Sequence, residues 1–183
     1  GKLKNVKGRM ELVRVFPDNT KIFIDFAHTP EAISSAINAL KLHYKKKITI
    51  VFGCGGERDK DKRKKIGKIV NKTCDKIYVT DDNPRNENPK KIRKSILKHI
   101  DKKKEKVIEI GNRSKAISEA IKNSRPNEII LIAGKGHEDI QDYGKVKIKI
   151  SDFNIINSIK IKKNISKKDI EISENKFLIN KTL

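Results

Sequence analysis

The sequence has no tryptophan, two cysteines and few aromatic residues, which make up 5% of the chain. It also lacks any apolar run approaching the ~20 residues that a helix needs to cross a bilayer, so the composition argues against an integral membrane protein. Residues 1–4 contain no apolar stretch like that of a signal peptide. We therefore expect a cytoplasmic protein with no membrane partner.

The two cysteines, Cys54 and Cys74, do not form a metal-binding pattern, which would need more ligands at short spacing. Cys54 lies in a glycine-rich segment where any small side chain suffices. We therefore expect reduced thiols without a chemical role, and no metal site in this chain.

The formal net charge of +21 is the strongest feature of the composition. Basic proteins gain affinity for nucleic acids by releasing counterions from phosphates, so a basic nucleic-acid-binding α/β module is the main alternative interpretation. Lysine, however, is spread over every predicted helix and is not clustered with aromatic rings on which bases could stack. The abundance of lysine, isoleucine and asparagine is also typical of an AT-rich genome. We therefore interpret the charge as a solvated surface and expect no nucleic-acid partner.

Several short segments are almost continuously apolar, which is typical of strands covered on both faces of a parallel sheet. The predicted strands are residues 22–26, 48–52, 76–80, 107–110 and 128–133. Between them, apolar residues recur at helical spacing. Capping residues before a proline, at Thr29-Pro30 and Asn88-Pro89, predict two helix starts, and Ser151 is expected to cap a last helix.

This alternation predicts an α/β fold with a Rossmann-like, doubly wound, mostly parallel sheet of about six strands and helices on both faces. In residues 145–150, lysine alternates strictly with apolar residues, which favours a half-exposed, antiparallel edge strand. Residues 1–15 are expected to be an entry strand or hinge. Residues 16–162 then form the domain, and residues 163–183 a weakly ordered tail.

Polar loops follow four of the predicted strands. They are residues 25–30, 53–59, 81–87 and 134–139. Ligands of open parallel sheets bind outside the carboxyl ends of the strands, so we expect these loops to form one site.

Two of these loops each allow two interpretations. Asp82 and Arg85, with Pro84 stiffening the chain between them, suit a ligand that carries both an ammonium and a carboxylate group; alternatively, the two side chains pair with each other at a surface turn. The glycines of residues 53–56 suit an anion bound by backbone N–H groups, with Arg58 adding a guanidinium for a carboxylate. They suit equally a tight turn that needs positive φ angles.

The loop Gly134-Lys135-Gly136 is similar to a phosphate loop but departs from the Walker pattern, because Gly136 replaces the Ser or Thr that follows the Lys. Glu138 suits an ammonium group, whereas His137 is expected to be a packing or capping residue. No Ser-His-Asp set or carboxylate pair follows from the spacing. We therefore expect no catalytic residue in this chain.

Five motifs, taken in order, resemble those of the MurE ligases of the Mur ligase family over residues 8 to about 160. They are Gly8-Arg9-Met10-Glu11 and residues 25–30, 52–60, 80–85 and 133–139. The resemblance implies the Rossmann-like, carboxy-terminal domain of a three-domain enzyme. In that family, ATP phosphorylates the γ-carboxylate of UDP-N-acetylmuramoyl-L-alanyl-D-glutamate, and the amine of meso-diaminopimelate then attacks the acyl phosphate.

The resemblance also implies roles for individual residues. The residues expected to hold diaminopimelate are Arg58, Asp82, Asn83, Pro84, Arg85, Gly134 and Glu138. Arg85 is the specificity signal, because diaminopimelate differs from lysine by a second carboxylate that a guanidinium recognises well. Arg9, Asp25 and His28 are expected near the nucleotide. A related ligase for lysine, ornithine or lanthionine is the remaining alternative.

The ATP loop and Mg²⁺ ligands of the family belong to a central domain, and nothing in this sequence resembles a Walker loop. The sequence also begins without Met, so we expect a piece of a longer enzyme. Residues 1–15 are expected to lead in from the central domain, and the enzyme is expected to be a monomer. Such a piece is expected to bind the amino acid weakly and to catalyse nothing by itself. ATP, Mg²⁺ and the UDP-linked dipeptide are expected to bind mainly elsewhere.

Overall fold

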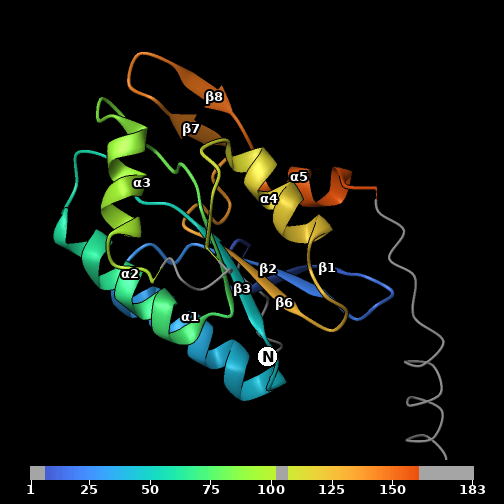
Figure 1. Cartoon of the computed structure of the whole chain (residues 1–183). Coiled ribbons are helices and arrows are strands. Elements are labelled where there is room, and N and C mark those ends of the chain that lie inside the picture. The colour runs from blue at the N-terminus through green and yellow to red at the C-terminus, as the bar shows by residue number, and fades with distance from the viewer. Residues whose placement is uncertain (1–6, 102–106, 161–183) are drawn as a thin grey trace, which may run out of the picture.

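The computed structural model describes residues 7–101 and 107–160, which form an α/β fold around a six-stranded sheet (Figure 1). The strand order is β1-β2-β6-β3-β4-β5. All neighbouring pairs are parallel except β1 and β2, which pair antiparallel at one edge. The strands are β1 (Glu11–Val15), β2 (Lys21–Asp25), β3 (Ile48–Phe52), β4 (Lys76–Val79), β5 (Val107–Glu109) and β6 (Ile129–Ala133). The predicted Rossmann-like, mostly parallel architecture is confirmed.

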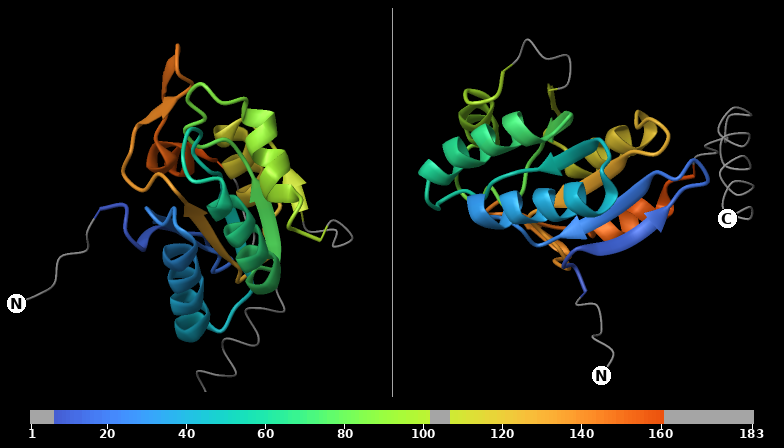
Figure 2. Two further views of the ribbon diagram at one scale, coloured as in Figure 1. Left: turned by 90° about the vertical axis from the view of Figure 1, so that its left-hand side faces the viewer. Right: turned by 90° about the horizontal axis from the view of Figure 1, so that it is seen from below.

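Helices cover both faces of this sheet (Figures 1 and 2). One face packs against α1 (Pro30–Tyr44), α2 (Asp61–Thr73) and α3 (Pro89–Leu97), and the other against α4 (Arg113–Lys122) and α5 (Asp152–Ser158). Successive strand residues point to opposite faces, so Phe23 belongs to the first hydrophobic core while Ile22 and Ile24 belong to the second. None of the helices in the described residues is long and apolar enough to cross a membrane.

The predicted capping residues set the starts of three helices. The side chain of Thr29 accepts a hydrogen bond from Ala32 N at 3.2 Å, and Asn88 caps α3 in the same way. Ser151 accepts from Asn154 N at 3.4 Å at the start of α5. Because each cap fixes where a helix begins, it also fixes the length of the polar loop before it.

The prediction that the main sheet has one antiparallel edge strand is confirmed, but the prediction that residues 145–150 supply it was wrong. There, β8 (Lys147–Lys149) pairs antiparallel with β7 (Ile140–Asp142) in a separate two-stranded sheet. All three residues of β8 are exposed, so the alternation of lysine with apolar residues does not mark a half-covered strand. The antiparallel edge of the main sheet is β1, within the segment expected to be an entry strand or hinge. Residues 1–6 of that segment and the predicted tail, residues 163–183, lie outside the described residues.

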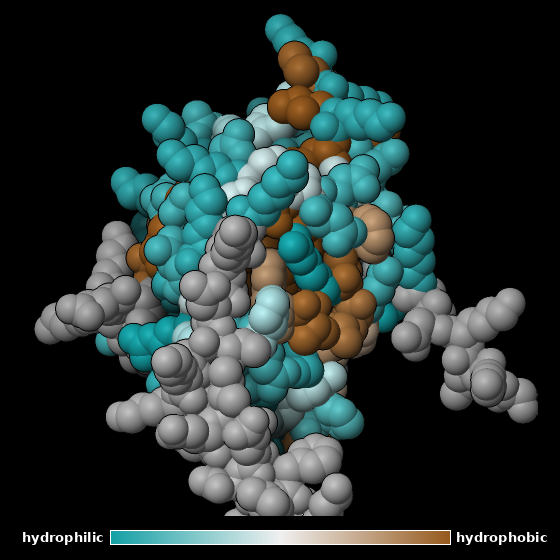
Figure 3. Space-filling view, turned by 90° about the vertical axis from the view of Figure 1, so that its right-hand side faces the viewer, coloured by the Kyte–Doolittle hydropathy of each residue, from teal (hydrophilic) through white to brown (hydrophobic). Residues whose placement is uncertain are grey.

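Figure 3 views the molecule from the side on which β1 and α5 lie in Figure 1. Leu12 and Val15 of β1 and Phe153 of α5 remain 43%, 49% and 39% exposed. Phe153 is the one aromatic residue among the large exposed hydrophobic side chains of the part of the chain that the structure describes.

Candidate functional site

The four polar loops meet at the carboxyl ends of β2, β3, β4 and β6, as expected for an open parallel sheet. They enclose a pocket of about 360 Å³. Its lining residues are Phe26, His28, Gly55, Arg58, Lys62, Asp82, Asn83, Arg85, Gly134 and Glu138. The structure thus brings together every residue predicted to hold the amino acid except Pro84, which is not among the lining residues.

The loop containing Arg85 is held on two sides. The backbone N–H of Arg85 donates to Asp142 O at 2.9 Å, and Nη1 of the Arg85 side chain donates to Gly56 O at 2.8 Å. Gly56 N donates to Asn83 O at 2.9 Å, which ties the same two loops again. Arg85 has a φ angle of 53°, in the left-handed region that is uncommon for residues other than glycine. The surrounding contacts therefore impose a defined backbone conformation on the predicted specificity residue.

Asp82 and Arg85 do not pair with each other among the described residues, so the alternative of a self-satisfied surface turn is wrong. Asp82 is only 7% exposed, yet its carboxylate accepts no hydrogen bond from any residue in ranges 7–101 and 107–160. A Cβ atom at Gly134, which has a φ angle of 114°, would lie 2.6 Å from Asp82 Oδ2. Glycine at position 134 thus leaves room for a carboxylate that faces the pocket without a protein partner.

The glycine-rich loop does not need positive φ angles at Gly53, Gly55 or Gly56, so that alternative is also wrong. Close packing explains Gly56 instead, because a Cβ atom there would lie 1.8 Å from Pro84 O. The loop is further fixed by a side chain that the sequence did not single out. Arg63 is 2% exposed and donates to both carboxylate oxygens of Glu87, at 2.7 Å each, and to Gly55 O at 3.2 Å.

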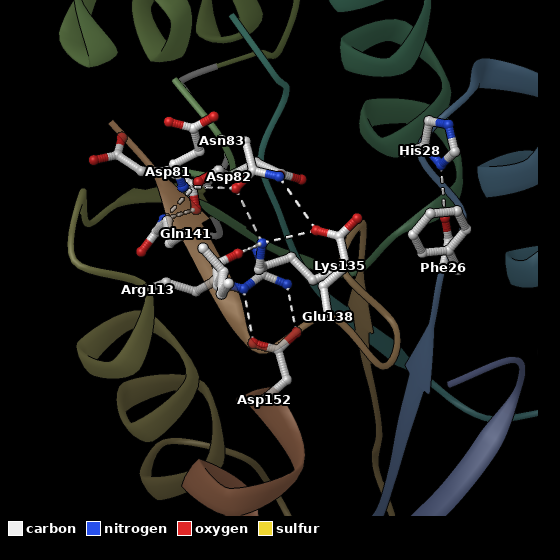
Figure 4. A network of polar contacts seen from close by, with 12 residues as sticks. Phe26, His28, Asp81, Asp82, Asn83, Arg113, Lys135, Glu138, Gln141 and Asp152 are labelled. Atoms are coloured by element: carbon white, nitrogen blue, oxygen red, sulfur yellow. Dashed lines mark hydrogen bonds and ion pairs between the residues drawn. The ribbon is translucent and has the colours of Figure 1, made fainter. Parts of the chain in front are cut away.

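Lys135 joins three parts of the site (Figure 4). Its side chain is 0% exposed, and its ammonium donates to Asn83 Oδ1 at 3.1 Å, Glu138 Oε2 at 3.0 Å and Ile140 O at 2.6 Å. All three donor hydrogens of the ammonium are thus committed to protein acceptors. The loop 134–136 therefore does not present Lys135 to a phosphate, in agreement with its departure from the Walker pattern.

A second network, built on the buried side chains of Arg93 and Asp81, supports the loop that carries Asp82. Arg93 donates to Asp81 and to Glu109 Oε1, the latter at 2.8 Å, while the hydroxyl of Tyr143 donates to Asp81 Oδ2 at 3.0 Å. Burial and the neighbouring charge of Asp81 raise the pKa of Tyr143 above its usual value, so the hydroxyl stays protonated. Gln141 Nε2 adds hydrogen bonds to the backbone oxygens of Asp81 and Asp82.

A third buried pair anchors the end of β6. Arg113 donates to Asp152 Oδ1 and Oδ2 at 2.8 and 2.7 Å and to Ala133 O at 3.1 Å. Burial opposes the charge of Arg113, but the attraction of Asp152 outweighs it and the pKa of the guanidinium lies above its usual value. This pair therefore joins α4, α5 and the strand end that precedes Gly134 (Figure 4).

The three residues expected near the nucleotide do not all line the pocket. His28 lines the pocket, whereas Arg9 and Asp25 do not. The two oxygens of Asp25 accept backbone hydrogen bonds from Met10 N at 2.6 Å and Ala27 N at 2.7 Å, and the guanidinium of Arg9 lies 5.5 Å from the centre of the Phe26 ring. Asp25 thus shapes the loop after β2, and a nucleotide near these three residues stays a prediction.

Two residues that line the pocket, Phe26 and Lys62, were not predicted as ligand contacts, and Gly55 was offered only as part of a possible anion-binding loop. Lys62 lies in the first turn of α2, directly after the loop that carries Arg58. The position of Lys62, in the first helical turn after a polar loop, could have indicated from the sequence that it lines the site.

Cys54 is buried beside the pocket, and burial raises the pKa of its thiol to about 12. The thiol is therefore inert near neutral pH. In the described ranges 7–101 and 107–160, no group of three or more His, Cys, Asp or Glu side chains could hold a metal ion. These residues alone do not fit a Mg²⁺ site.

Comparison with known sequences identifies related proteins whose similarity extends over most of this chain. A ligase from Rickettsia montanensis, named UDP-N-acetylmuramoyl-L-alanyl-D-glutamate--2,6-diaminopimelate ligase, is 47% identical over 157 residues. A ligase of the same name from Buchnera aphidicola subsp. Schizaphis graminum is 47% identical over 154 residues. In each case the match covers 84% of this chain but only 31% of the relative. The chain thus spans about a third of the length of these relatives.

Among solved structures, one described as a UDP-N-acetylmuramoyl-L-alanyl-D-glutamate--2,6-diaminopimelate ligase is 34% identical, with a TM-score of 0.77 over 86% of this chain and 32% of that chain. A murein peptide ligase from Psychrobacter arcticus, 17% identical with a TM-score of 0.56 over 74% of this chain and 28% of its own, shares the fold. The family described as "Mur ligase, glutamate ligase domain" matches residues 8–136. The chain therefore belongs to the Mur ligase family, through its glutamate ligase domain.

Proposed function

We propose that this domain binds meso-diaminopimelate within an ATP-dependent ligase that joins it to UDP-N-acetylmuramoyl-L-alanyl-D-glutamate, a step in the synthesis of peptidoglycan precursors. The names of the Rickettsia and Buchnera relatives support this substrate. The observation that carries the proposal is the charge pattern of the pocket. Two acidic residues, Asp82 and Glu138, line the same pocket as three basic residues, Arg58, Lys62 and Arg85.

This pattern matches the charges of diaminopimelate, which has two ammonium and two carboxylate groups. Asp82 and Glu138 are suited to the ammonium groups, and the guanidinium groups of Arg58 and Arg85 to the carboxylates. Lysine and ornithine lack the second carboxylate and would leave a pocket cation without a partner. Lanthionine has both carboxylates, so it is the alternative that charge alone does not distinguish.

The contribution of the domain is orientation. ATP converts the γ-carboxylate of the acceptor into an acyl phosphate, the amine of the bound amino acid attacks the carbonyl carbon, and phosphate leaves. Holding the amine near the activated carbonyl turns a bimolecular step into an effectively unimolecular one. The ammonium of Lys135 is occupied by protein acceptors, and no described cluster fits a metal ion. We therefore assign ATP and Mg²⁺ mainly to parts of the ligase outside this domain.

We propose domain limits that are consistent with this function. Residues 1–15 would lead in from a central domain and include the edge strand β1, residues 16–162 would form the amino-acid-binding domain, and residues 163–183 would be a tail. A monomeric, cytoplasmic enzyme stays our expectation.

A substrate panel tests this function. The complete ligase, supplied with ATP, Mg²⁺ and the UDP-linked dipeptide, is assayed for ADP release with diaminopimelate, lanthionine, lysine and ornithine in turn. We expect the highest kcat/KM with diaminopimelate and the lowest with lysine and ornithine. A preference for lysine, or ADP release that does not depend on any added amino acid, would contradict the proposal.

The alternative of a nucleic-acid-binding module has a separate test. It predicts binding that weakens steeply with salt. Filter binding of the 183-residue chain to DNA and RNA at two salt concentrations measures this directly. We expect weak binding at physiological salt, and tight, sequence-independent binding would count against the proposed function.

A further inference from the structure

We propose that Lys135 is a positioning residue that fixes which polar atoms Asn83 and Glu138 present to the bound amino acid. This inference rests on the proposed function, since it concerns the same pocket. Lys135 itself is not among the lining residues, and its side chain is fully buried. It therefore acts on a ligand only through its neighbours.

The first neighbour is Asn83, whose side-chain amide has one accepting and one donating end. Its Oδ1 accepts two hydrogen bonds, from Lys135 Nζ at 3.1 Å and from Asp142 N at 3.0 Å. A flipped amide would bring its NH₂ group against these two donors and would lose both contacts. Asn83 is thus restricted to presenting its NH₂ group, and because one N–H donates to Glu138 Oε2, one N–H is left for a ligand, which suits a carboxylate oxygen and not an ammonium.

The second neighbour is Glu138, which stands three residues after Lys135. Its Oε2 accepts from Lys135 Nζ at 3.0 Å and from Asn83 Nδ2 at 3.2 Å. Its side chain is 38% exposed, and in the described residues its Oε1 accepts no hydrogen bond. One carboxylate oxygen is therefore anchored, and the other is left for a ligand ammonium.

Together, the two neighbours give the pocket a fixed polarity at this end. An N–H donor and a carboxylate lie side by side, 3.2 Å apart at Asn83 Nδ2 and Glu138 Oε2, which suits a ligand that carries both a carboxylate and an ammonium group. A lysine side chain has the length and charge to reach both partners from a buried position. A neutral side chain at position 135 would leave Asp142 N as the one donor to Asn83 Oδ1 among the described residues and Asn83 Nδ2 as the one donor to Glu138 Oε2, so both side chains would be held less firmly.

If Lys135 only stabilised the fold, its loss would not selectively change the Asn83 amide or the KM for diaminopimelate. Removal of a buried charge lowers stability wherever it is located, so stability alone does not separate the two roles. Glu128→Gln is a matched control, because Glu128 is also buried, accepts from Thr49 Oγ1 at 2.6 Å and precedes β6 at the opposite edge of the sheet. It removes a buried charge without touching the pocket.

The test compares Lys135→Met with Glu128→Gln in two measurements. In the 183-residue chain without ligand, NMR follows the two side-chain amide protons of Asn83. In the complete ligase, steady-state kinetics give KM for diaminopimelate and for ATP. For Lys135→Met we expect faster exchange of the Asn83 amide protons and a KM for diaminopimelate raised roughly tenfold, the equivalent of losing about one charge-assisted hydrogen bond. The KM for ATP should stay within about twofold, and Glu128→Gln should change neither readout.

Unchanged Asn83 amide signals in Lys135→Met, or an equal rise of both KM values, would overturn the inference. If Lys135→Met does not fold, the wild-type chain decides, through a scalar coupling between Lys135 Nζ and Asn83 Cγ across their hydrogen bond. Detection of that coupling supports the fixed amide, and its absence rejects it. A ligase that refuses diaminopimelate while its Asn83 amide still depends on Lys135 would overturn the proposed substrate and leave the positioning role intact.

Discussion

Two sets of charged side chains occupy the carboxyl edge of this sheet, and they are satisfied in opposite ways. The buried set is paired within the protein: Arg63 with Glu87, Arg93 with Asp81 and Glu109, and Arg113 with Asp152. In the pocket set, Arg58, Lys62, Arg85 and Asp82 form no ion pairs among the described residues, and Glu138 pairs through one carboxylate oxygen with the buried Lys135. The buried pairs thus determine the shape of the loops, whereas the pocket charges remain available to a ligand.

Mutations in the two sets are expected to change the free energy of unfolding by different amounts. A buried charge that loses its partner is left uncompensated, which destabilises the fold strongly. A pocket charge that is solvated in the free protein contributes little to folding. Stability measurements on single variants therefore separate the sets, with expected effects that decrease from the buried pairs to the pocket.

The largest effect is expected for Arg113→Met. It leaves the fully buried carboxylate of Asp152 without its partner and removes the hydrogen bond to Ala133 O. We expect the free energy of unfolding, measured by urea denaturation of the 183-residue chain, to fall by about 3–5 kcal/mol. The double variant Arg113→Met/Asp152→Leu, in which no charge is left buried, should recover much of this loss. A loss no larger than that of a surface substitution would remove the distinction between the sets.

An intermediate effect is expected from protonation of Glu87. Its hydrogen bonds to Arg63 hold the pKa of this carboxyl below its usual value. Because the pKa is lowered in the folded state, the stabilisation is fully present above the unfolded value of about 4.3 and is lost as pH falls through the lower, folded value. Urea midpoints measured between about pH 7 and pH 3 should fall less steeply for Glu87→Gln than for wild type. Parallel pH profiles would mean that the Arg63–Glu87 pair does not stabilise the loop.

The smallest effect on folding is expected for Arg58→Ala. Arg58 is exposed and lines the pocket, so the free energy of unfolding should change by no more than ~0.5 kcal/mol. The KM of the complete ligase for diaminopimelate should nevertheless rise. A substantial loss of stability with unchanged KM would place Arg58 in the structural set.

The location of the site could be predicted from the sequence because chain order determines which loops share an edge of a parallel sheet. Loops that follow β2, β3, β4 and β6 necessarily meet there, so Asp82, Gly134 and Glu138 could be assigned to one site from chain order alone. The short, weakly patterned segments were harder to predict. β7 has three residues, of which only Gln141 is buried, and β1 is interrupted by an irregular register between Leu12 and Arg14.

The supporting contacts could not be predicted from the sequence, because they join residues far apart in the chain. Lys135 and Asn83 are 52 positions apart, and Gln141 and Asp82 are 59 apart. Sequence spacing gives no information on whether a lysine in a glycine-rich loop faces a phosphate or turns into the protein. In this chain it turns inward, where its ammonium donates to Asn83, Glu138 and the backbone oxygen of Ile140.

The central claim is that Arg85 recognises the second carboxylate of diaminopimelate, and Arg85→Ala in the complete ligase tests it most directly. Steady-state kinetics should show a KM for diaminopimelate raised about 10- to 150-fold, the equivalent of roughly 1.5–3 kcal/mol for one charge-assisted contact. The KM for ATP and the weak activity with lysine should change little, because neither ligand supplies that carboxylate. A change confined to ATP, or equal losses with diaminopimelate and lysine, would contradict the account.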